Sequence, residues 1–394
     1  MRWINFLHLY QPANIDSYSI KQALDKSYYR LIRLMEENQN LKMTWNISGC
    51  LLLRLEDEGK HDFINRLQSL VASKRLELVS TAAYHPLLPL IPASETIRQI
   101  KENEKILRHF FGSKFKTAGF FLPEMAYSPA VGKLIKELGY KWIILDEFAF
   151  SGGLERPNFR RFYLDKHSGL KIIFRNRPYS SSYPPDKLLH EKSEQRQEKI
   201  IITATDAELY GLRHQDPTGE LERAAKRSDL KTDTVSGFID WISSQGIEPE
   251  EVAIKSGSWE SSRKELSSGK YFNLWQDKKN KIHVQLWRLA NLVLSLDKEF
   301  RQDRNYRYYR WHLVRGLASC TFWWASARDF SKIFGPYAWN PDGIERGLED
   351  LIRAVRSLDD RRSRKYKLKA EKQYLKIKKL IWEEHWRKHW KKAP

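Results

Sequence analysis

The order of apolar patterns along the chain constrains its fold more than any other feature. Through the first two-thirds, short apolar runs alternate with longer stretches whose apolar residues recur at helical spacing. Strands separated by helical patterns indicate βαβ units and a parallel sheet. The expected strands cover residues 2–7, 42–47, 76–81, 117–122, 141–145, 171–175, 199–204 and 252–255. The expected helices between them cover residues 20–37, 62–73, 94–110, 130–138 and 234–244.

The strand count favours a closed or nearly closed β/α barrel over an open sheet. Residues 161–164 and 171–175 are separated by a short turn and predict a hairpin inserted in the series. Beyond Gly269 strand patterns stop, and helical patterns cover residues 282–301, 306–327, 343–358 and 361–390. We therefore predict a catalytic barrel over residues 1–269, a helical domain over 270–360 and a helical tail over 361–394.

Composition excludes several classes of protein. Cys50 and Cys320 are the only two cysteines and lie far apart in sequence, so a disulfide scaffold is excluded. Fourteen Trp, 18 Tyr and 18 Phe exclude a disordered chain. Residues 3–9 lack the pattern of an export signal, and no stretch is apolar enough to span a membrane. These features predict a soluble, cytoplasmic protein.

The net charge of +20 is concentrated near the end of the chain. Residues 353–392 contain 16 Lys or Arg against 5 Asp or Glu. Trp382, Trp386 and Trp390 follow each other at a spacing of four, on one face of a helix. Such a tail could contact nucleic acid or an acidic lipid surface. The favoured interpretation is a solvated helix whose aromatic stripe packs on the rest of the protein.

Polar side chains gather where the predicted strands end. Barrel enzymes carry their catalytic groups at the carboxyl ends of the strands. The residues at these ends are His8, Tyr10, Gln11, Tyr84, His85, Glu124, Asp146, Glu147, Asp206 and Glu208. Such groups are costly inside a barrel, so their gathering at one rim predicts a functional site.

The rim residues suit a pair of catalytic carboxylates better than a metal. Metal sites need three or four ligands, often with two His at close spacing, whereas His8 and His85 are isolated. A carboxylate pair needs one Glu or Asp from each of two strands: one protonates the leaving oxygen, and the other attacks or activates water. With 14 Trp available to stack on sugar faces, a carbohydrate is the expected substrate.

Six runs resemble, in order, the motifs of glycoside hydrolase family 57. They are residues 8–12 (HLYQP), 84–90 (YHPLLPL), 119–127 (GFFLPEMAY), 205–211 (TDAELYG), 257–260 (GSWE) and 319–326 (SCTFWWAS). The resemblance covers roughly residues 1–340. It implies an incomplete (β/α)7 barrel followed by a helical domain, with a retaining enzyme acting on α-glucans and, in a few members, on α-galactosides.

The resemblance also assigns the chemistry. By position in the motifs, Glu124 matches the nucleophile and Asp206 the general acid/base, and no metal or organic cofactor is expected. A retaining mechanism requires Glu124 to be ionised and the pKa of Asp206 to lie well above its usual value of about 3.9. Repulsion from Glu208 and Glu124 could supply that shift. The two carboxyl groups are expected about 5–5.5 Å apart.

The remaining candidates are expected to bind substrate. His8, Gln11, His85 and Asp146 could bind sugar hydroxyls, or they could simply close the barrel mouth. Trp259 and Trp324 could stack on sugar rings, although a Trp at such a place is often core. The expected substrate-binding residues are His8, Gln11, His85, Asp146, Trp259 and Trp324.

Two departures from the family motifs leave the substrate class open. Many members have Asp where this chain has Cys320, and a second His where it has Tyr10. The leading hypothesis is an amylase-like hydrolase of α-glucans. The alternatives are a 4-α-glucanotransferase or branching enzyme on the same site, and an idle glucan-binding homologue. A nucleic-acid partner ranks lowest, because the rim carboxylates would repel phosphates.

Overall fold

The computed structural model describes residues 1–153, 155–191, 198–327 and 338–390. The chain forms two compact units. The first contains residues 1–11, 15–83 and 88–271, and the second contains residues 12–14, 84–87 and 272–394. Two short loops of the N-terminal half thus belong to the C-terminal unit.

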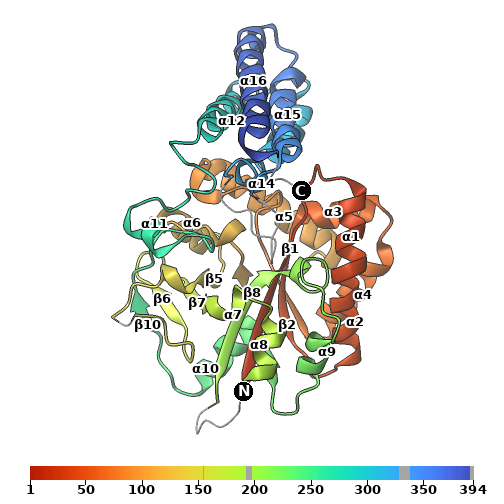
Figure 1. Cartoon of the computed structure of the whole chain (residues 1–394), viewed down its shortest axis with the longest axis vertical. Coiled ribbons are helices and arrows are strands. Elements are labelled where there is room, and N and C mark those ends of the chain that lie inside the picture. Colours follow the sequence, from red (N-terminus) through yellow and green to blue (C-terminus); the bar gives the residue numbers. More distant parts are fainter. Residues whose placement is uncertain (154, 192–197, 328–337, 391–394) are drawn as a thin grey trace. The chain divides into compact units, whose positions relative to one another are not determined.

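The first unit is an α/β structure built on two sheets (Figure 1). One sheet has the order β3-β2-β1-β8, with β9 also paired to β1, and all its pairs are parallel. The other has the order β10-β6-β7-β5-β4, parallel except for β6 with β7. The strands are β1 (Arg2–Leu9), β2 (Met43–Ile47), β3 (Leu76–Val79), β4 (Gly119–Phe120), β5 (Trp142–Asp146), β6 (Tyr163–Asp165), β7 (Lys171–Arg175), β8 (Ile200–Asp206), β9 (Lys231–Asp233) and β10 (Glu250–Val252).

Hydrogen bonds join both edges of the first sheet, at β3 and at β8, to the second sheet. Ser80, just after β3, forms a parallel bridge with Phe120 of β4. Asn176, just after β7, bonds Ile202 of β8 twice at 2.7 Å, through its backbone N–H and its side-chain oxygen. The backbone groups at these edges are therefore paired within the unit, which leaves fewer strand edges open to water.

The strands form because most of their residues are apolar and shielded on both sides. All eight residues of β1 and all five of β2 and β5 are buried. Strands that are buried along their whole length are typical of parallel sheets with helices over them. The expectation of an α/β fold with parallel sheets is confirmed. So is the hairpin, in which Tyr163 of β6 is paired antiparallel with Ile172 of β7.

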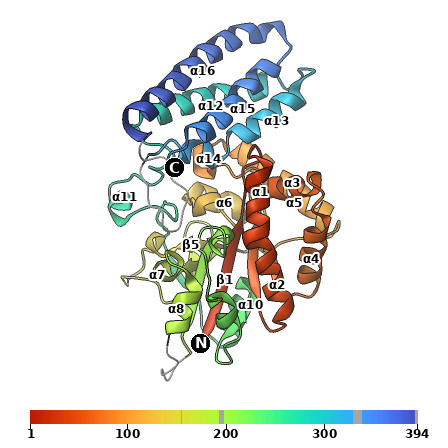
Figure 2. The same ribbon diagram turned by 45° about the vertical axis from the view of Figure 1, so that its right-hand side comes forward.

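Helices lie around the strands of the first unit (Figures 1 and 2). In α2 the buried residues Leu31, Ile32, Leu34 and Met35 fall on one face, as helical spacing predicts. The helices are α1 (Ser17–Ala23), α2 (Tyr29–Glu37), α3 (Gly49–Asp57), α4 (His61–Ala72), α5 (Ala93–Phe111), α6 (Pro129–Glu137), α7 (Arg177–Ser180), α8 (Pro184–His190), α9 (Glu220–Ala225), α10 (Val235–Ser244) and α11 (Arg263–Ser267). A π-helical turn, η1 (Leu24–Tyr28), joins α1 to α2, and sequence patterns missed α3.

The second unit is helical in its described part. Its helices are α12 (Lys281–Glu299), α13 (Tyr306–Gly316), α14 (Ser319–Trp323), α15 (Pro341–Ser357) and α16 (Arg364–Glu384), which runs on into the π-helical turn η7 (His385–His389). Figure 2 shows α12, α13, α15 and α16 side by side, and the other three each pack on α15. Among the described residues, no helix has the length and apolarity to cross a membrane.

One expected helix of this unit is broken in two. The pattern predicted a single helix over residues 306–327, but α13 ends at Gly316 and α14 starts at Ser319. The backbone N–H of Ser319 donates to the carbonyl of His85 at 2.9 Å instead of continuing the helix. A distant loop therefore overrides the local helical pattern, which periodicity alone does not reveal.

Candidate active site

The backbone at Glu124 sets the direction of its carboxylate. β4 is followed by a short 3₁₀ helix, Pro123–Met125, inside which Glu124 has φ 61° and ψ 17°. Met125 is also left-handed, with φ 48°. A residue with a side chain adopts this region at a cost, and such positions cluster at functional sites.

Trp259 holds Glu124 in two ways. Its indole N–H donates to Oε2 of Glu124 at 2.9 Å, and its backbone N–H donates to the Glu124 carbonyl at 3.1 Å. A donor at this distance stabilises the ionised carboxylate and fixes its orientation. Trp259 is buried, so its first role in the structure is to position Glu124.

Asp206 ends β8 directly beside β1. The parallel register pairs Asp206 with His8, which lies inside β1 and not after it as the sequence pattern indicated. Arg213 donates to Oδ2 of Asp206 at 2.5 Å. The Asp206 side chain is 26% exposed, so one of the two predicted catalytic carboxylates is open to a ligand.

Glu208 follows Asp206 by two residues, in the turn after β8, and is almost fully buried. It accepts hydrogen bonds from the Tyr28 hydroxyl and, at 2.8 Å, from Nε2 of Gln11. Burial raises the pKa of Glu208 to about 7, with Arg213 opposing the shift and Asp206 adding to it. Two carboxylates thus share one arginine, and near neutral pH this cluster retains a proton.

His8 is a neutral side chain at the same place. Burial lowers its pKa to about 4, although Asp206 and Asn46 act in the opposite direction. Nδ1 lies 2.8 Å from Oδ1 of Asn46, which places the ring proton on Nδ1. The imidazole stacks on Phe121 with ring centres 4.5 Å apart, and it meets Trp259 edge-on at 6.1 Å.

Asp146 is surrounded by arginines. Its oxygens accept from Nε of Arg175 at 2.8 Å and from Nη1 of Arg177 at 3.0 Å, and it is 2% exposed. Arg175 also donates to the carbonyls of Ala204 and Trp259, at 2.8 and 3.2 Å. The predicted sugar contact of Asp146 stays a prediction. In the structure, Asp146 and Arg175 tie the segments that carry Asp206 and Trp259 to each other.

Sequence analysis did not select four residues of this cluster. Arg175 ends a predicted strand, Arg213 follows the TDAELYG run by two residues, and Glu260 ends the GSWE run, so position alone could have found them. No sequence pattern pointed to Arg177. The Glu260 side chain is exposed, yet surrounding protein atoms still desolvate its carboxyl and raise its pKa, with Arg175 and Arg177 opposing. A further carboxylate therefore lies within electrostatic reach of Asp146, Asp206 and the two arginines.

Two predicted site residues lie in the second unit. His85 is buried with φ 56°, and its Nδ1 lies 2.9 Å from the hydroxyl of Ser319. Trp324 is 9% exposed, and a Cβ placed on Gly343 would lie 2.4 Å from its ring. Within their unit both residues therefore hold elements together, and their contact with substrate stays a prediction.

The first unit thus joins most of the predicted site residues through a chain of contacts. Glu124 accepts a hydrogen bond from Trp259, Trp259 contacts His8, and His8 lies beside Asp206. Gln11 joins this chain through its hydrogen bond to Glu208. Asp146 joins it through Arg175, which also bonds the Trp259 carbonyl. Among the described residues, no group of three or more His, Cys, Asp or Glu is arranged to hold a metal ion. The separation of the Glu124 and Asp206 carboxyl groups stays a prediction.

A family model matches most of the first unit. The model described as glycosyl hydrolase family 57 matches residues 4–253, a range that contains Glu124 and Asp206.

Individual relatives are more distant. An alpha-amylase of Pyrococcus horikoshii is 28% identical over 223 residues, which cover 53% of this chain and 34% of that protein. The chain therefore matches about a third of that relative's length.

Solved structures share the fold. A 4-alpha-glucanotransferase of Thermococcus litoralis has a TM-score of 0.69 at 19% identity, over 91% of this chain and 60% of that one. A branching enzyme of the same family from Thermococcus kodakaraensis has a TM-score of 0.67 at 16% identity, over 95% of each chain.

Proposed function

The chain belongs to glycosyl hydrolase family 57, and from this premise we propose that it cleaves α-glucans with retention of configuration. The observation that carries the proposal is the left-handed Glu124, whose carboxylate accepts the Trp259 indole N–H at 2.9 Å. A fixed, ionised carboxylate at a strand end is what a glycosidase nucleophile requires. Asp206 at the end of β8 supplies the proton.

The reaction takes two displacements. Glu124 attacks the anomeric carbon as the glycosidic C–O bond breaks, and Asp206 gives its proton to the leaving sugar oxygen. A glycosyl ester on Glu124 results. Asp206, now ionised, takes a proton from water or from a sugar hydroxyl, whose oxygen attacks the anomeric carbon and releases Glu124. The second step returns both residues to their starting states.

The cluster around Asp206 supports its role as the acid. Glu208 has a pKa of about 7 and shares Arg213 with Asp206. A buried carboxyl group that holds a proton up to about neutral pH therefore lies beside the same arginine as Asp206.

We infer that the two joined sheets form the incomplete barrel that the family motifs imply. Going around the unit, β8, β1, β2 and β3 meet β4 through Ser80 and Phe120, and β5 and β7 return to β8 through Asn176. Seven strands arranged in this way support a (β/α)7 barrel whose strand ends carry Glu124, Asp146 and Asp206. The helical residues 272–394 follow it in sequence.

Product analysis tests the activity. The purified protein and a Glu124→Gln variant are incubated with maltoheptaose, and the products are separated by chain length. We expect shorter oligosaccharides from the parent protein and none from the variant. The absence of products from both proteins, with α-galactosides also uncleaved, would leave the idle glucan-binding homologue as the better hypothesis.

The same experiment separates hydrolysis from transfer. The two differ only in whether water or a sugar hydroxyl reaches the glycosyl ester. Glucose and maltose without longer products indicate an amylase-like hydrolase. Products longer than seven glucose units indicate a transferase, and new branch points formed from amylose indicate a branching enzyme.

A further inference from the structure

The outward face of α16 carries basic and apolar side chains and no exposed acid. Between residues 361 and 390, all of which the structure describes, the exposed residues are Arg361, Arg362, Arg364, Lys365, Leu368, Lys369, Lys372, Leu375, Lys376, Lys379, Trp386, Arg387, Lys388 and Trp390. We call this set the α16 face. The opposite side of the helix packs on the unit through Ala370, Ile377 and Ile381.

Most of these cations are not neutralised by the protein. The acidic residues of the segment are half-buried and already paired, Glu371 with Arg356, Glu383 with Lys379 and Glu384 with Lys388. Within the described part of the chain, no acidic side chain pairs with Arg361, Arg364, Lys365, Lys369, Lys372, Lys376 or Arg387. A row of this kind attracts a surface of opposite charge.

Apolar side chains are exposed within the same face. Leu368 and Leu375 are 58% and 63% exposed, and Trp386 is 60% exposed. Leu368, Leu375 and Trp382 follow each other at a spacing of seven, so they form one line along the helix, and Trp386 stacks on Trp382. The expected packing of the aromatic stripe therefore holds only in part: Trp382 bonds Glu345, while Trp386 faces outward.

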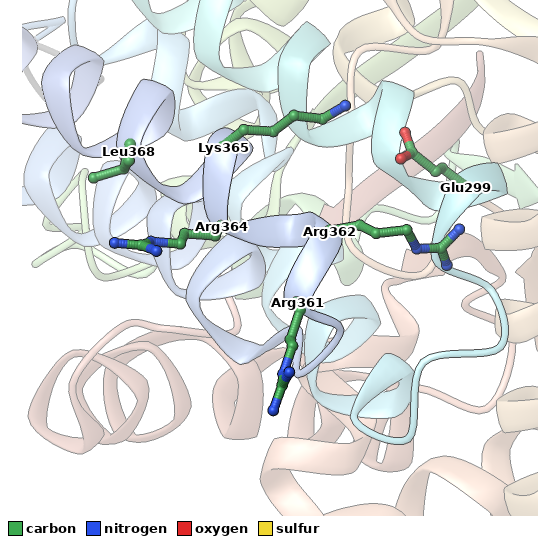
Figure 3. A pocket seen from close by; sticks show the side chains of 6 residues that line it. All are labelled: Glu299, Arg361, Arg362, Arg364, Lys365 and Leu368. Atoms are coloured by element: carbon green, nitrogen blue, oxygen red, sulfur yellow. The ribbon is translucent and has the colours of Figure 1, made fainter.

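The start of the helix adds a hollow lined by cations. A cavity of about 410 Å³ is bounded by Glu299, Arg361, Arg362, Arg364, Lys365 and Leu368. Figure 3 shows the four basic side chains spreading from the start of α16 and from the short 3₁₀ helix before it (Arg361–Ser363), with Arg362 reaching toward Glu299. Arg362 is already paired with Asp360, which leaves the other three cations for an anion such as a phosphate group.

We propose that the α16 face binds an anionic lipid surface. A long helix with Lys and Arg beside Leu and Trp is the pattern of helices that lie in a membrane interface. The leucines and Trp386 would enter the headgroup boundary, and the lysines would extend their ammonium groups to lipid phosphates. A flat surface also suits α16, whose 21 residues form one continuous helix.

Two other partners fit the α16 face less well. Nucleic acid would use the cations and could stack on Trp386, but exposed leucines offer nothing to phosphates or bases. A neutral glucan would not require the cations. The lipid surface is the one partner that uses both kinds of side chain.

Vesicle flotation of the whole protein tests the proposal. We expect the protein to float with vesicles of phosphatidylcholine and phosphatidylglycerol, not with phosphatidylcholine alone, and to be released by high salt. Each lysine near an anionic membrane adds roughly a fivefold factor in affinity. The triple variant K369E/K372E/K376E should therefore bind at least about 100-fold more weakly.

Two further variants make the result specific. K101E/K105E/K133E changes the charge equally on exposed residues of α5 and α6 and should bind within about twofold of the parent. L368S/L375S keeps every cation and should bind roughly 10-fold more weakly, because the apolar insertion is lost. All variants should cleave maltoheptaose like the parent, which separates this proposal from the proposed function.

Three outcomes would overturn the proposal. The first is no flotation with anionic vesicles. The second is equal loss in the two charge variants, which would mean attraction by net charge alone. The third is full binding by L368S/L375S together with tighter binding to a poly(U) RNA than to vesicles, which would assign the face to nucleic acid.

Discussion

At the scale of single residues, the site works through pairs in which one side chain fixes another. Glu124 depends on Trp259, Asp206 on Arg213, and Asp146 on two arginines. The stacking of Trp259 on sugar stays a prediction; in the structure its indole N–H donates to Glu124 and its ring meets His8 and Phe121. This gives Trp259 a role that a single substitution can measure.

Replacing Trp259 by Phe should lower kcat about 10- to 100-fold while leaving the fold intact. The change removes one hydrogen bond to a charged carboxylate, worth about 1.5–3 kcal/mol, and keeps an aromatic ring. Trp142→Phe is the matched control, because its indole N–H bonds Ser236 at 2.9 Å, outside the cluster. Steady-state kinetics on maltoheptaose and thermal melts check both variants. Equal kcat values in the two would contradict the role of Trp259.

Replacing Glu208 by Gln should change how stability depends on pH. The pKa of Glu208 rises from 4.5 in the unfolded chain to about 7 in the fold, so the folded state holds the proton more tightly. The free energy of unfolding therefore falls as pH rises from about 4.5 to about 7, by on the order of 3 kcal/mol. Glu208→Gln should be less sensitive to pH over this window, and more stable than the parent at pH 8.

Urea unfolding at pH 5 and pH 8 measures this difference. Tyr28→Phe should act in the opposite direction, because it removes a hydrogen bond that favours the charged carboxylate and so raises the Glu208 pKa further. Identical pH profiles for the parent and Glu208→Gln would show that Glu208 is ionised throughout this range.

At the scale of elements, the sequence patterns located most strands and the long helices. β7 and the hairpin with β6 matched closely, because short apolar runs on either side of a short polar turn are local signals. α3 was missed, and the pattern over residues 306–327 predicted one helix where there are two. The break at Ser319 is set by the His85 carbonyl, a contact between residues distant in sequence.

The residues of the candidate site likewise fall into those that the sequence indicated and those that only the fold brings together. Glu124 and Asp206 were predictable because family motifs mark them, and strand ends indicated His8 and Asp146. The arginines were not predicted, because an Arg in a sequence usually indicates a surface. Only the fold shows Arg175 at 5% exposure between Asp146 and two backbone carbonyls.

The turn after β8 depends on a glycine. Gly211 has φ 125°, and a Cβ on it would lie 2.1 Å from the carbonyl oxygen of Lys26 in η1. Gly211→Ala should therefore destabilise the protein by roughly 3 kcal/mol or more. Gly246→Ala, with φ 69° and no atom within 4 Å of its Cβ, should cost only about 1 kcal/mol. Chemical denaturation compares the two, and similar costs would contradict the close contact at Gly211.

The two sides of α16 should respond differently to truncation. Ile377 is fully buried and Leu375 is 63% exposed, although they are two residues apart. Ile377→Ala should cost about 3 kcal/mol, and Leu375→Ala should change stability by less than about 0.5 kcal/mol. Thermal unfolding of both variants checks the orientation of the helix. A large loss in Leu375→Ala would mean that the α16 face is covered by protein.

At the scale of the whole molecule, charge and chemistry occupy different units. The carboxylates Glu124, Asp146, Asp206 and Glu260 all belong to the first unit, whereas the α16 face belongs to the second. The chain's net charge of +20 is therefore no guide to the site, where negative groups and their arginine partners dominate. The two proposals therefore concern different units: a sugar site in the first unit and an anion-binding surface in the second.

Trapping with azide tests the central claim, that Glu124 is the nucleophile and Asp206 the acid/base. Glu124→Ala and Asp206→Ala are each incubated with α-maltosyl fluoride and sodium azide, and the anomeric configuration of the product is read by NMR. Fluoride leaves without a proton, so both variants can react.

Azide should replace fluoride directly in Glu124→Ala and give the β-azide. In Asp206→Ala it should attack the glycosyl ester on Glu124 and give the α-azide. A β-azide from Asp206→Ala, or an α-azide from Glu124→Ala, would contradict this assignment.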